Sequence, residues 1–409
     1  MKILPMIPAS LVWMVALSTV VLPSTARGEV LFETVYRVRV DDKLMLTAGA
    51  MELATPAASA DGTMLFVGTS HGHLYKMQLV DGKERVRRDL PGGVTNIVTL
   101  GNDLLVSTDN GRLYRMAQED LKDRWKKPLQ VKGALHTTPI VASGGKVVFI
   151  QDDRDVVHVV SLDNGTLISS YDEQSYSVRG LSPVTVFGYP GMTVAGSALY
   201  AGFETGLSAC FDASAAAASG EFTLRWKRGL CTEGTLKDVY LANPEGRLCS
   251  PRRTFRDVDT HPTLTEFGLL TGCHCRGLVM LNPETGDIVW ETPILGPGSP
   301  AISGKVAIVS AADGNAYAVD LEKGKIRWKT RLGLQLTPKP TLMGVSGDSA
   351  DPLFAFASGE DLFVVSGKDG TIKGRFFTMQ GVAAPPLYLG QSLFFVSNEG
   401  FLYRVDAFR

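Results

Sequence analysis

The stretch MLFVGTSHGHLYKM at residues 64–77 is followed at residues 104–116 by LLVSTDNGRLYRM, which has the same layout. Each copy has an apolar run, a turn that contains glycine, and a second apolar run with a tyrosine. Two apolar runs joined by a short glycine turn are typical of a β-hairpin. The unit recurs with turns near residues 72, 111, 155, 206, 277, 314, 360 and 400. The sequence therefore contains an internal repeat of about forty residues.

Other residues recur at fixed places around these hairpins. A proline precedes seven of the eight hairpins: Pro56, Pro139, Pro183, Pro262, Pro300, Pro338 and Pro385. All four tryptophans beyond the N-terminal segment follow a hairpin: Trp125, Trp226, Trp290 and Trp328. One strand before and one strand after each hairpin give four strands per unit, and about forty residues per four-stranded unit is typical of a β-propeller. Eight units predict an all-β, eight-bladed β-propeller.

The two ends of the chain predict how the ring closes. The last unit stops after its third strand, at Leu402–Asp406, so its fourth strand is missing. Residues 30–40 supply a spare strand in which Tyr36, Val38 and Val40 alternate with arginines. We expect this strand to complete the eighth blade, because pairing there removes two exposed sheet edges. Residues 27–409 should then form one domain, with an insertion at about 229–256 between blades four and five.

Residues 1–26 have the layout of a secretory signal peptide. Lys2 precedes a run over residues 3–22 that is almost wholly apolar, and small residues lie at 24–26 before a cleavage point after Ala26. An uncleaved anchor helix is the alternative, which two prolines and the shortness of the run beyond them, at residues 11–22, disfavour. The first cysteine is Cys210, so the signal lacks a lipobox cysteine. We expect an exported, periplasmic protein.

The charge balance bears on the class of partner. The 41 Lys and Arg residues against 42 Asp and Glu give a net charge of −1, so the totals do not indicate a nucleic-acid-binding protein. No second apolar segment is long enough to cross a membrane. We expect the mature chain to be a soluble monomer.

The stretch AVDLEKGKIRW at residues 318–328 matches the AxDxxxGKxxW tryptophan-docking motif of quinoprotein (PQQ-like) propellers. The resemblance implies that Trp125, Trp226, Trp290 and Trp328 pack between neighbouring blades, and that Gly324 permits the tight turn before the last of them. The motif specifies architecture and says little about chemistry.

Two further stretches are similar to loops of the BamB family, the propeller subunit of the outer-membrane β-barrel assembly machinery. They are YSVRGLSP at residues 176–183 and DVDTHP at residues 257–262. The resemblance implies a scaffold peripheral to the outer membrane that binds POTRA domains of BamA and helps unfolded outer-membrane proteins to fold. The implied contact residues are Tyr176, Val178, Arg179, Asp257 and Asp259. A periplasmic paralogue that binds another protein or a glycan is the alternative.

Strand parity gives an independent check on these contact residues. In a four-stranded antiparallel blade, the central hairpin turn and the connection to the next blade emerge on the same face, where loops carry binding function. Arg179 and the Asp257/Asp259 pair lie in successive connections, so we expect them to be neighbours. Arg179 offers a bidentate fork to a carboxylate, and the aspartates suit a basic partner. The alternative is that the aspartates are solvated turn residues and that Arg179 pairs with one of them.

All five cysteines fall between residues 210 and 275. Export favours disulfides, and four cysteines allow three connectivities. We expect a Cys231–Cys249 disulfide across the insertion, whereas a Cys273–Cys275 bridge would close a strained ring. The alternative partners of Cys273 and Cys275 are Cys210 and the insertion. Zinc bound by Cys273, His274 and Cys275 with other ligands is the alternative.

The sequence does not predict an enzyme or a bound cofactor. A PQQ-dependent dehydrogenase shares this fold, but the chain has no adjacent cysteines and no recognisable calcium cluster. It also has no P-loop and no Ser-His-Asp arrangement. A quinoprotein dehydrogenase with a degenerate site remains the alternative.

Overall fold

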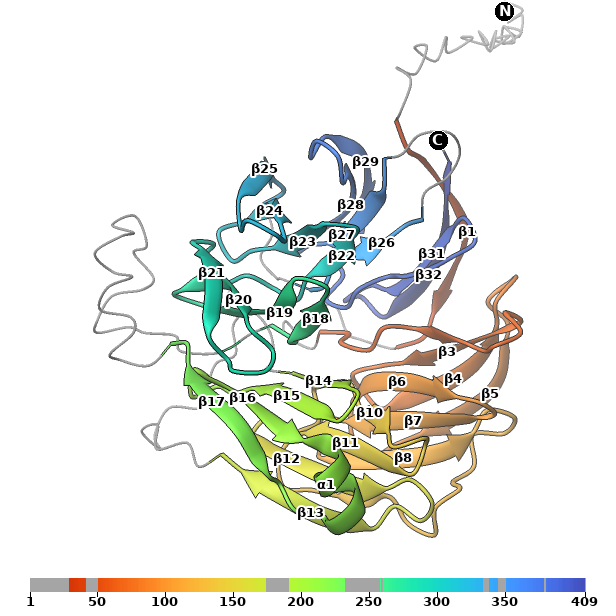
Figure 1. Cartoon of the computed structure of the whole chain (residues 1–409). Helices are drawn as coiled ribbons and strands as arrows, with labels where there is room; N and C mark the ends of the chain where they lie inside the picture. Colours follow the sequence, from red (N-terminus) through yellow and green to blue (C-terminus); the bar gives the residue numbers. More distant parts are fainter. Residues whose placement is uncertain are drawn as a thin grey trace, which may run out of the picture.

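The computed structural model describes residues 29–41, 51–173, 191–231, 258, 260–333, 338–344, 351–378 and 380–408. These residues form eight four-stranded antiparallel sheets arranged as the blades of a propeller (Figure 1). The predicted all-β, eight-bladed propeller is therefore confirmed. Among the described residues, no helix is long and apolar enough to cross a membrane.

The blades are numbered in chain order. Blade one contains β2 (Ala57–Ala58), β3 (Met64–Gly68), β4 (His73–Gln78) and β5 (Glu84–Asp89), and blade two contains β6 (Val94–Leu100), β7 (Asp103–Thr108), β8 (Arg112–Ala117) and β9 (Leu129–Gln130). Blade three contains β10 (Ile140–Ala142), β11 (Val147–Gln151), β12 (Val156–Ser161) and β13 (Leu167–Asp172), and blade four contains β14 (Met192–Ala195), β15 (Ala198–Gly202), β16 (Leu207–Asp212) and β17 (Leu224–Gly229). Blade five contains β18 (Thr263–Thr265), β19 (Gly268–Cys273), β20 (Gly277–Leu281) and β21 (Ile288–Thr292), and blade six contains β22 (Ala301–Ser303), β23 (Val306–Ser310), β24 (Asn315–Asp320) and β25 (Ile326–Arg331). Blade seven contains β26 (Thr341–Leu342), β27 (Leu353–Ala357), β28 (Asp361–Ser366) and β29 (Ile372–Phe377), and blade eight contains β30 (Leu387–Leu389), β31 (Ser392–Val396), β32 (Phe401–Phe408) and β1 (Leu31–Arg39).

The first strand of each blade lies nearest the axis, where strands such as β10, β14 and β18 contact one another. The two central strands are buried on both faces because each blade is covered by its neighbours; β7, for example, is buried along its whole length. Burial on both faces explains why these strands are continuous apolar runs. The outer strands alternate, as β25 does with its half-exposed pattern.

The N-terminal strand closes the ring as predicted. β1 pairs antiparallel with β32, so the eighth blade combines the two ends of the described chain (Figure 1). This pairing gives β32 a neighbour on each side and covers one edge of β32 and one edge of β1.

The four tryptophans join successive blades. Each donates a hydrogen bond from its indole Nε1 to a backbone oxygen of the next blade, at 2.8 to 3.0 Å: Trp125 to Leu162, Trp226 to Pro283, Trp290 to Leu321 and Trp328 to Gly367. Each indole also lies on a glycine with positive φ in that blade: Gly165, Gly286, Gly324 and Gly370. Gly324 therefore receives Trp290, while Trp328 from the same motif docks on blade seven.

Tyr36 fills the same role where the ring closes. Its hydroxyl donates to the backbone oxygen of Leu79 at 3.1 Å, and its ring lies on Gly82. The register of β1 against β32 shifts just before Tyr36, as that of β25 against β24 shifts just before Trp328. Tyr36 is thus the docking aromatic of blade eight.

Where blades one and two meet, a smaller side chain replaces the docking tryptophan and a larger one replaces the glycine. Val86 stands at the tryptophan position of β5, opposite Lys76 and just after the register shift. Leu121 stands at the glycine position of blade two, with φ 58 and its side chain fully buried. Leu121 and Val86 belong to one apolar cluster, so a large residue on one side offsets a small one on the other.

Two local features differ from the repeat. In blade four, α1 (Ala213–Ser219) replaces the turn between the third and fourth strands, begins at the N-cap Asp212 and ends at Gly220 with φ 76. In blade two, the fourth strand is only Leu129–Gln130, and Trp125 precedes it. Pro128 accounts for this shortening, because proline cannot donate a ladder hydrogen bond.

Candidate partner-binding rim

The hairpin turns and the connections between blades lie on one face, which we call the docking rim. The five predicted contact residues, Tyr176, Val178, Arg179, Asp257 and Asp259, lie outside the described residues. The structure does describe the residues that flank these positions in the chain. Glu173 and Gly191 flank the segment 174–190, and Cys231 and Val258 flank the segment 232–257.

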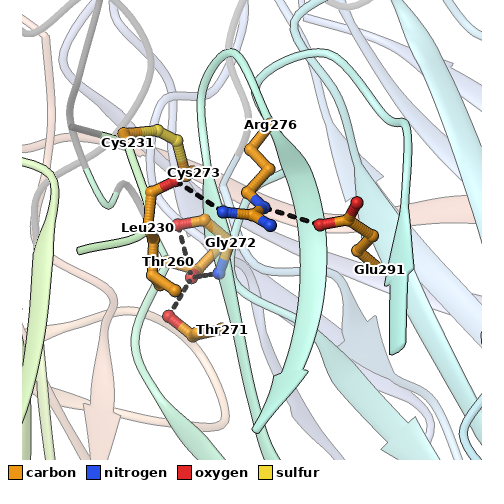
Figure 2. Close-up of a disulfide and its surroundings, with 8 residues drawn as sticks. All are labelled: Leu230, Cys231, Thr260, Thr271, Gly272, Cys273, Arg276 and Glu291. Carbon is orange, nitrogen blue, oxygen red and sulfur yellow. Dashed lines mark hydrogen bonds and ion pairs between the residues drawn. A yellow bond between two sulfur atoms is a disulfide. The ribbon is translucent and has the colours of Figure 1, made fainter. Parts of the chain in front are cut away.

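Val258 and Thr260 fix the chain to the rim on either side of position 259. The Val258 side chain is fully buried, and its backbone N–H donates to the oxygen of Phe203 at 3.3 Å. It packs so closely on Gly202 that a Cβ there would lie 2.7 Å from Cγ1 of Val258. Thr260 is also fully buried, and its hydroxyl contacts that of Thr271 at 3.2 Å (Figure 2).

The ends of the two candidate segments meet. The imidazole of His261 lies on Gly191, where a Cβ would be 2.5 Å from the ring. The backbone N–H of His261 donates to the Ser299 hydroxyl at 3.0 Å. Burial, with a smaller effect of the Lys339 charge, lowers the pKa of His261 to about 4. The imidazole of His261 is therefore neutral at pH 7, and it brings the C-terminal end of segment 174–190 into contact with the chain that follows segment 232–257.

The other end of segment 174–190 begins at a buried acid. The Glu173 carboxylate accepts from the Tyr171 hydroxyl at 2.7 Å and pairs with the Lys227 ammonium at 2.5 Å. Lys227 belongs to β17, so this ion pair crosses from blade three to blade four. The same acid raises the pKa of Tyr171, after the larger effect of burial.

The predicted Cys231–Cys249 disulfide is wrong, because Cys231 pairs with Cys273. Cys231 follows the last strand of blade four and Cys273 ends the second strand of blade five. These two positions share the docking rim, and their Cα atoms are 6.2 Å apart, which is within the usual range for a disulfide. Figure 2 shows the bond between the two blades. Cys249 lies outside the described residues.

Arg276 supports this junction from blade five (Figure 2). Its guanidinium donates to the backbone oxygen of Leu230 at 3.2 Å and pairs with Glu291 at 2.6 Å. Leu230 directly precedes Cys231, so the exit of blade four is held by both a covalent bond and a charged hydrogen bond.

The remaining described cysteines differ in state. Cys275 is disulfide-bonded, as Cys273 is, so neither sulfur is a free thiol in this structure. Cys210 is a free, buried thiol, and burial raises its pKa to about 11. A thiol with that pKa is a poor nucleophile at neutral pH. Among the described residues, no three His, Cys, Asp or Glu side chains are grouped to hold a metal ion.

Sequence reasoning did not single out Glu173, Lys227 or His261. The sequence does show that blade three departs from the repeat at Asp155, because most hairpins have glycine at this position. The contact of His261 with Gly191 has no signal in the sequence, since it depends on how two connections approach the axis.

The fold and the docked tryptophans define a quinoprotein-type eight-bladed propeller. The family described as outer membrane protein assembly factor BamB matches residues 10–231 and 261–408. The chain therefore belongs to this family.

Known structures give the same fold. The crystal structure of BamB from Moraxella catarrhalis matches with a TM-score of 0.70 at 14% identity, over 92% of this chain and 100% of that one. The computationally designed Ika8 protein matches with a TM-score of 0.61 at 10% identity, over 88% of this chain and 96% of that one. A search of curated protein sequences gives no match.

Proposed function

We propose that the chain is a non-catalytic scaffold of the outer-membrane β-barrel assembly machinery, which binds a POTRA domain of a BamA-like protein through the docking rim. Membership of the BamB family supports the machinery. The observation that carries the site is the contact of His261 with Gly191, which brings together the ends of the two segments that bear the candidate residues.

The proposed contact combines an apolar anchor with two kinds of charge. Tyr176 and Val178 supply apolar area, which is what the centre of a protein interface requires. Arg179 offers a planar fork to a carboxylate of the partner. Asp257 and Asp259 offer negative charge to basic groups. Opposite charges at one site favour a single orientation of the partner.

The anchoring of Val258 supports the role of the two aspartates. Side chains alternate in an extended chain, so residues on either side of an inward one share the outward direction. Val258 is fully buried. We therefore expect both carboxylates to be available to a partner.

The mechanism is recruitment, without a chemical step. Docked aromatics and the Cys231–Cys273 disulfide join the blades that carry the rim. A scaffold whose blades are held in place loses little conformational freedom on binding, which favours affinity. Bound to the machinery, the protein would orient unfolded outer-membrane proteins for insertion. We place it in the periplasm after removal of residues 1–26, peripheral to the outer membrane, with no cofactor.

Arg179→Glu tests the site. We expect it to weaken binding to purified POTRA domains by about 2 kcal/mol, because charge reversal replaces an attraction by a repulsion. Biolayer interferometry measures the affinity, and thermal unfolding checks the fold. Arg154→Glu is the matched control: Arg154 is an exposed arginine in a hairpin turn of the same rim.

Equal losses from the two variants would show that only the net charge of the rim matters. Unchanged binding by folded Arg179→Glu would remove Arg179 from the site.

A further inference from the structure

Asp155 occupies a position that five of the other blades give to glycine. The residue whose N–H closes the hairpin turn is Gly72, Gly111, Gly206, Gly314 and Gly400 in five other blades, with φ from 78 to 87. In blade three it is Asp155, with φ 62. A side chain in this backbone region costs about 1 kcal/mol or more, and such outliers gather at functional positions.

The partner of Asp155 departs from the repeat as well. In these five blades the backbone oxygen of the turn glycine accepts from an apolar residue at 2.8 to 3.1 Å: Leu90, Val131, Leu230, Leu332 and Val40. In blade three the donor is Glu173, and the distance is 3.4 Å. An apolar residue and a glycine are thus replaced by two acids at the contact that closes the blade. Glu173 is also the last described residue before segment 174–190.

The carboxyl of Asp155 is buried and incompletely bonded. Its residue is 2% exposed, and Oδ1 accepts from the backbone N–H of Glu204 in blade four at 3.0 Å. Oδ2 has no hydrogen-bond partner, and neither has Oε1 of Gln151, whose Nε2 donates to Gly202 of the same blade-four hairpin. A buried carboxyl oxygen without a donor costs less free energy when the carboxyl is protonated, because the neutral form loses less hydration than the carboxylate.

The charges around Asp155 also favour protonation. Burial, followed by the Glu173 and Asp152 carboxylates, raises the pKa of Asp155 to about 7, against the hydrogen bonds from Glu204 and Thr205. The other titratable and charged groups on the packed elements are Asp153, Arg154, His158, Tyr171, Glu204 and Lys227. Lys227 is already paired with Glu173, and His158 lies 3.3 Å from Asp152, so neither neutralises Asp155.

We propose that Asp155 is a proton-operated latch between blades three and four, at the root of segment 174–190. With its proton, Asp155 carries no charge against Glu173 and holds the hairpin of blade four through Glu204. When the proton leaves Oδ2, two carboxylates face each other across the contact that closes blade three, and the contact opens more often.

Hydrogen exchange at the Glu173 and Glu204 amides tests the latch without any partner, so its outcome is independent of the proposed function. A closed-state pKa of about 7 against an ordinary value in the open state predicts that protection, corrected for intrinsic rates, falls about tenfold from pH 6 to pH 8.

The variant Asp155→Asn should abolish this pH dependence, because asparagine tolerates positive φ and keeps an acceptor but cannot ionise. Asp155→Gly, which suits the backbone as in the other blades, should abolish it too. Asp153→Asn is the control, since Asp153 is an exposed acid of the same turn, and it should retain the tenfold change. A tenfold change that persists in Asp155→Asn, or its absence from the unmodified protein, would overturn the latch.

Discussion

At the scale of single residues, Trp290 and Gly324 show how closely the blades are fitted. A Cβ at Gly324 would lie 2.7 Å from the indole of Trp290, and the backbone there has φ 67. Glycine satisfies both requirements, since it has no Cβ and adopts positive φ without strain.

Gly324→Ala should therefore destabilise the protein by about 2–5 kcal/mol, the sum of backbone strain and overpacking against the indole. The urea midpoint of unfolding measures the change. Gly304→Ala is the matched control, because Gly304 also has positive φ but has nothing within 4 Å of its Cβ position. The control should lose only about 1–2 kcal/mol. Equal losses would mean that the tryptophan contact contributes nothing.

At this scale, the role of a residue can be predicted from the sequence where one residue type fills that role in every repeat. The roles of the tryptophans and of Gly324 could be predicted because the motif spaces them regularly. Tyr36 and the Val86–Leu121 pair do the same work with other residues, and only the register shift before each identifies them. The disulfide could not be predicted in this way, because the spacing of the cysteines along the chain is compatible with three connectivities. The position of blade four beside blade five determines which cysteines meet.

At the scale of elements, β1 determines whether the ring is closed. Its pairing with β32 could be predicted because the last repeat lacks a strand and the N-terminal segment supplies one. α1 could not be predicted from the repeat, since it is an insertion into one turn, although an N-cap Asp212 before an alanine run favours it. The short β9 follows from Pro128.

Tyr36→Ala tests the closure. We expect a loss of about 3–5 kcal/mol, because the substitution removes the docking ring and its hydrogen bond to Leu79 and leaves a cavity. Tyr36→Phe should cost about 1 kcal/mol, since only the hydrogen bond is lost.

Thermal and urea unfolding measure both variants. Val35→Ala is the control on the same strand, with a side chain that is 43% exposed. A Tyr36→Ala protein as stable as this control would show that β1 closes the ring by backbone pairing alone.

At the scale of the whole molecule, repeat phasing predicted eight blades and one ring, because each blade needs the same apolar runs and turns. The docking rim could be predicted only as a face, through strand parity. Which of its residues bind depends on connections that differ from blade to blade, such as the one that ends where His261 lies on Gly191. The five candidate contact residues therefore stay a prediction.

The central claim is that this rim binds the outer-membrane assembly machinery. The most direct measurement is an affinity pull-down of the tagged mature protein from detergent-solubilised envelope, with Asp257→Lys/Asp259→Lys as the control bait. We predict that the unmodified protein recovers a BamA-like protein and that the charge-reversed bait, folded equally well, does not. Failure of a well-folded unmodified bait to recover any subunit of the machinery would contradict the account.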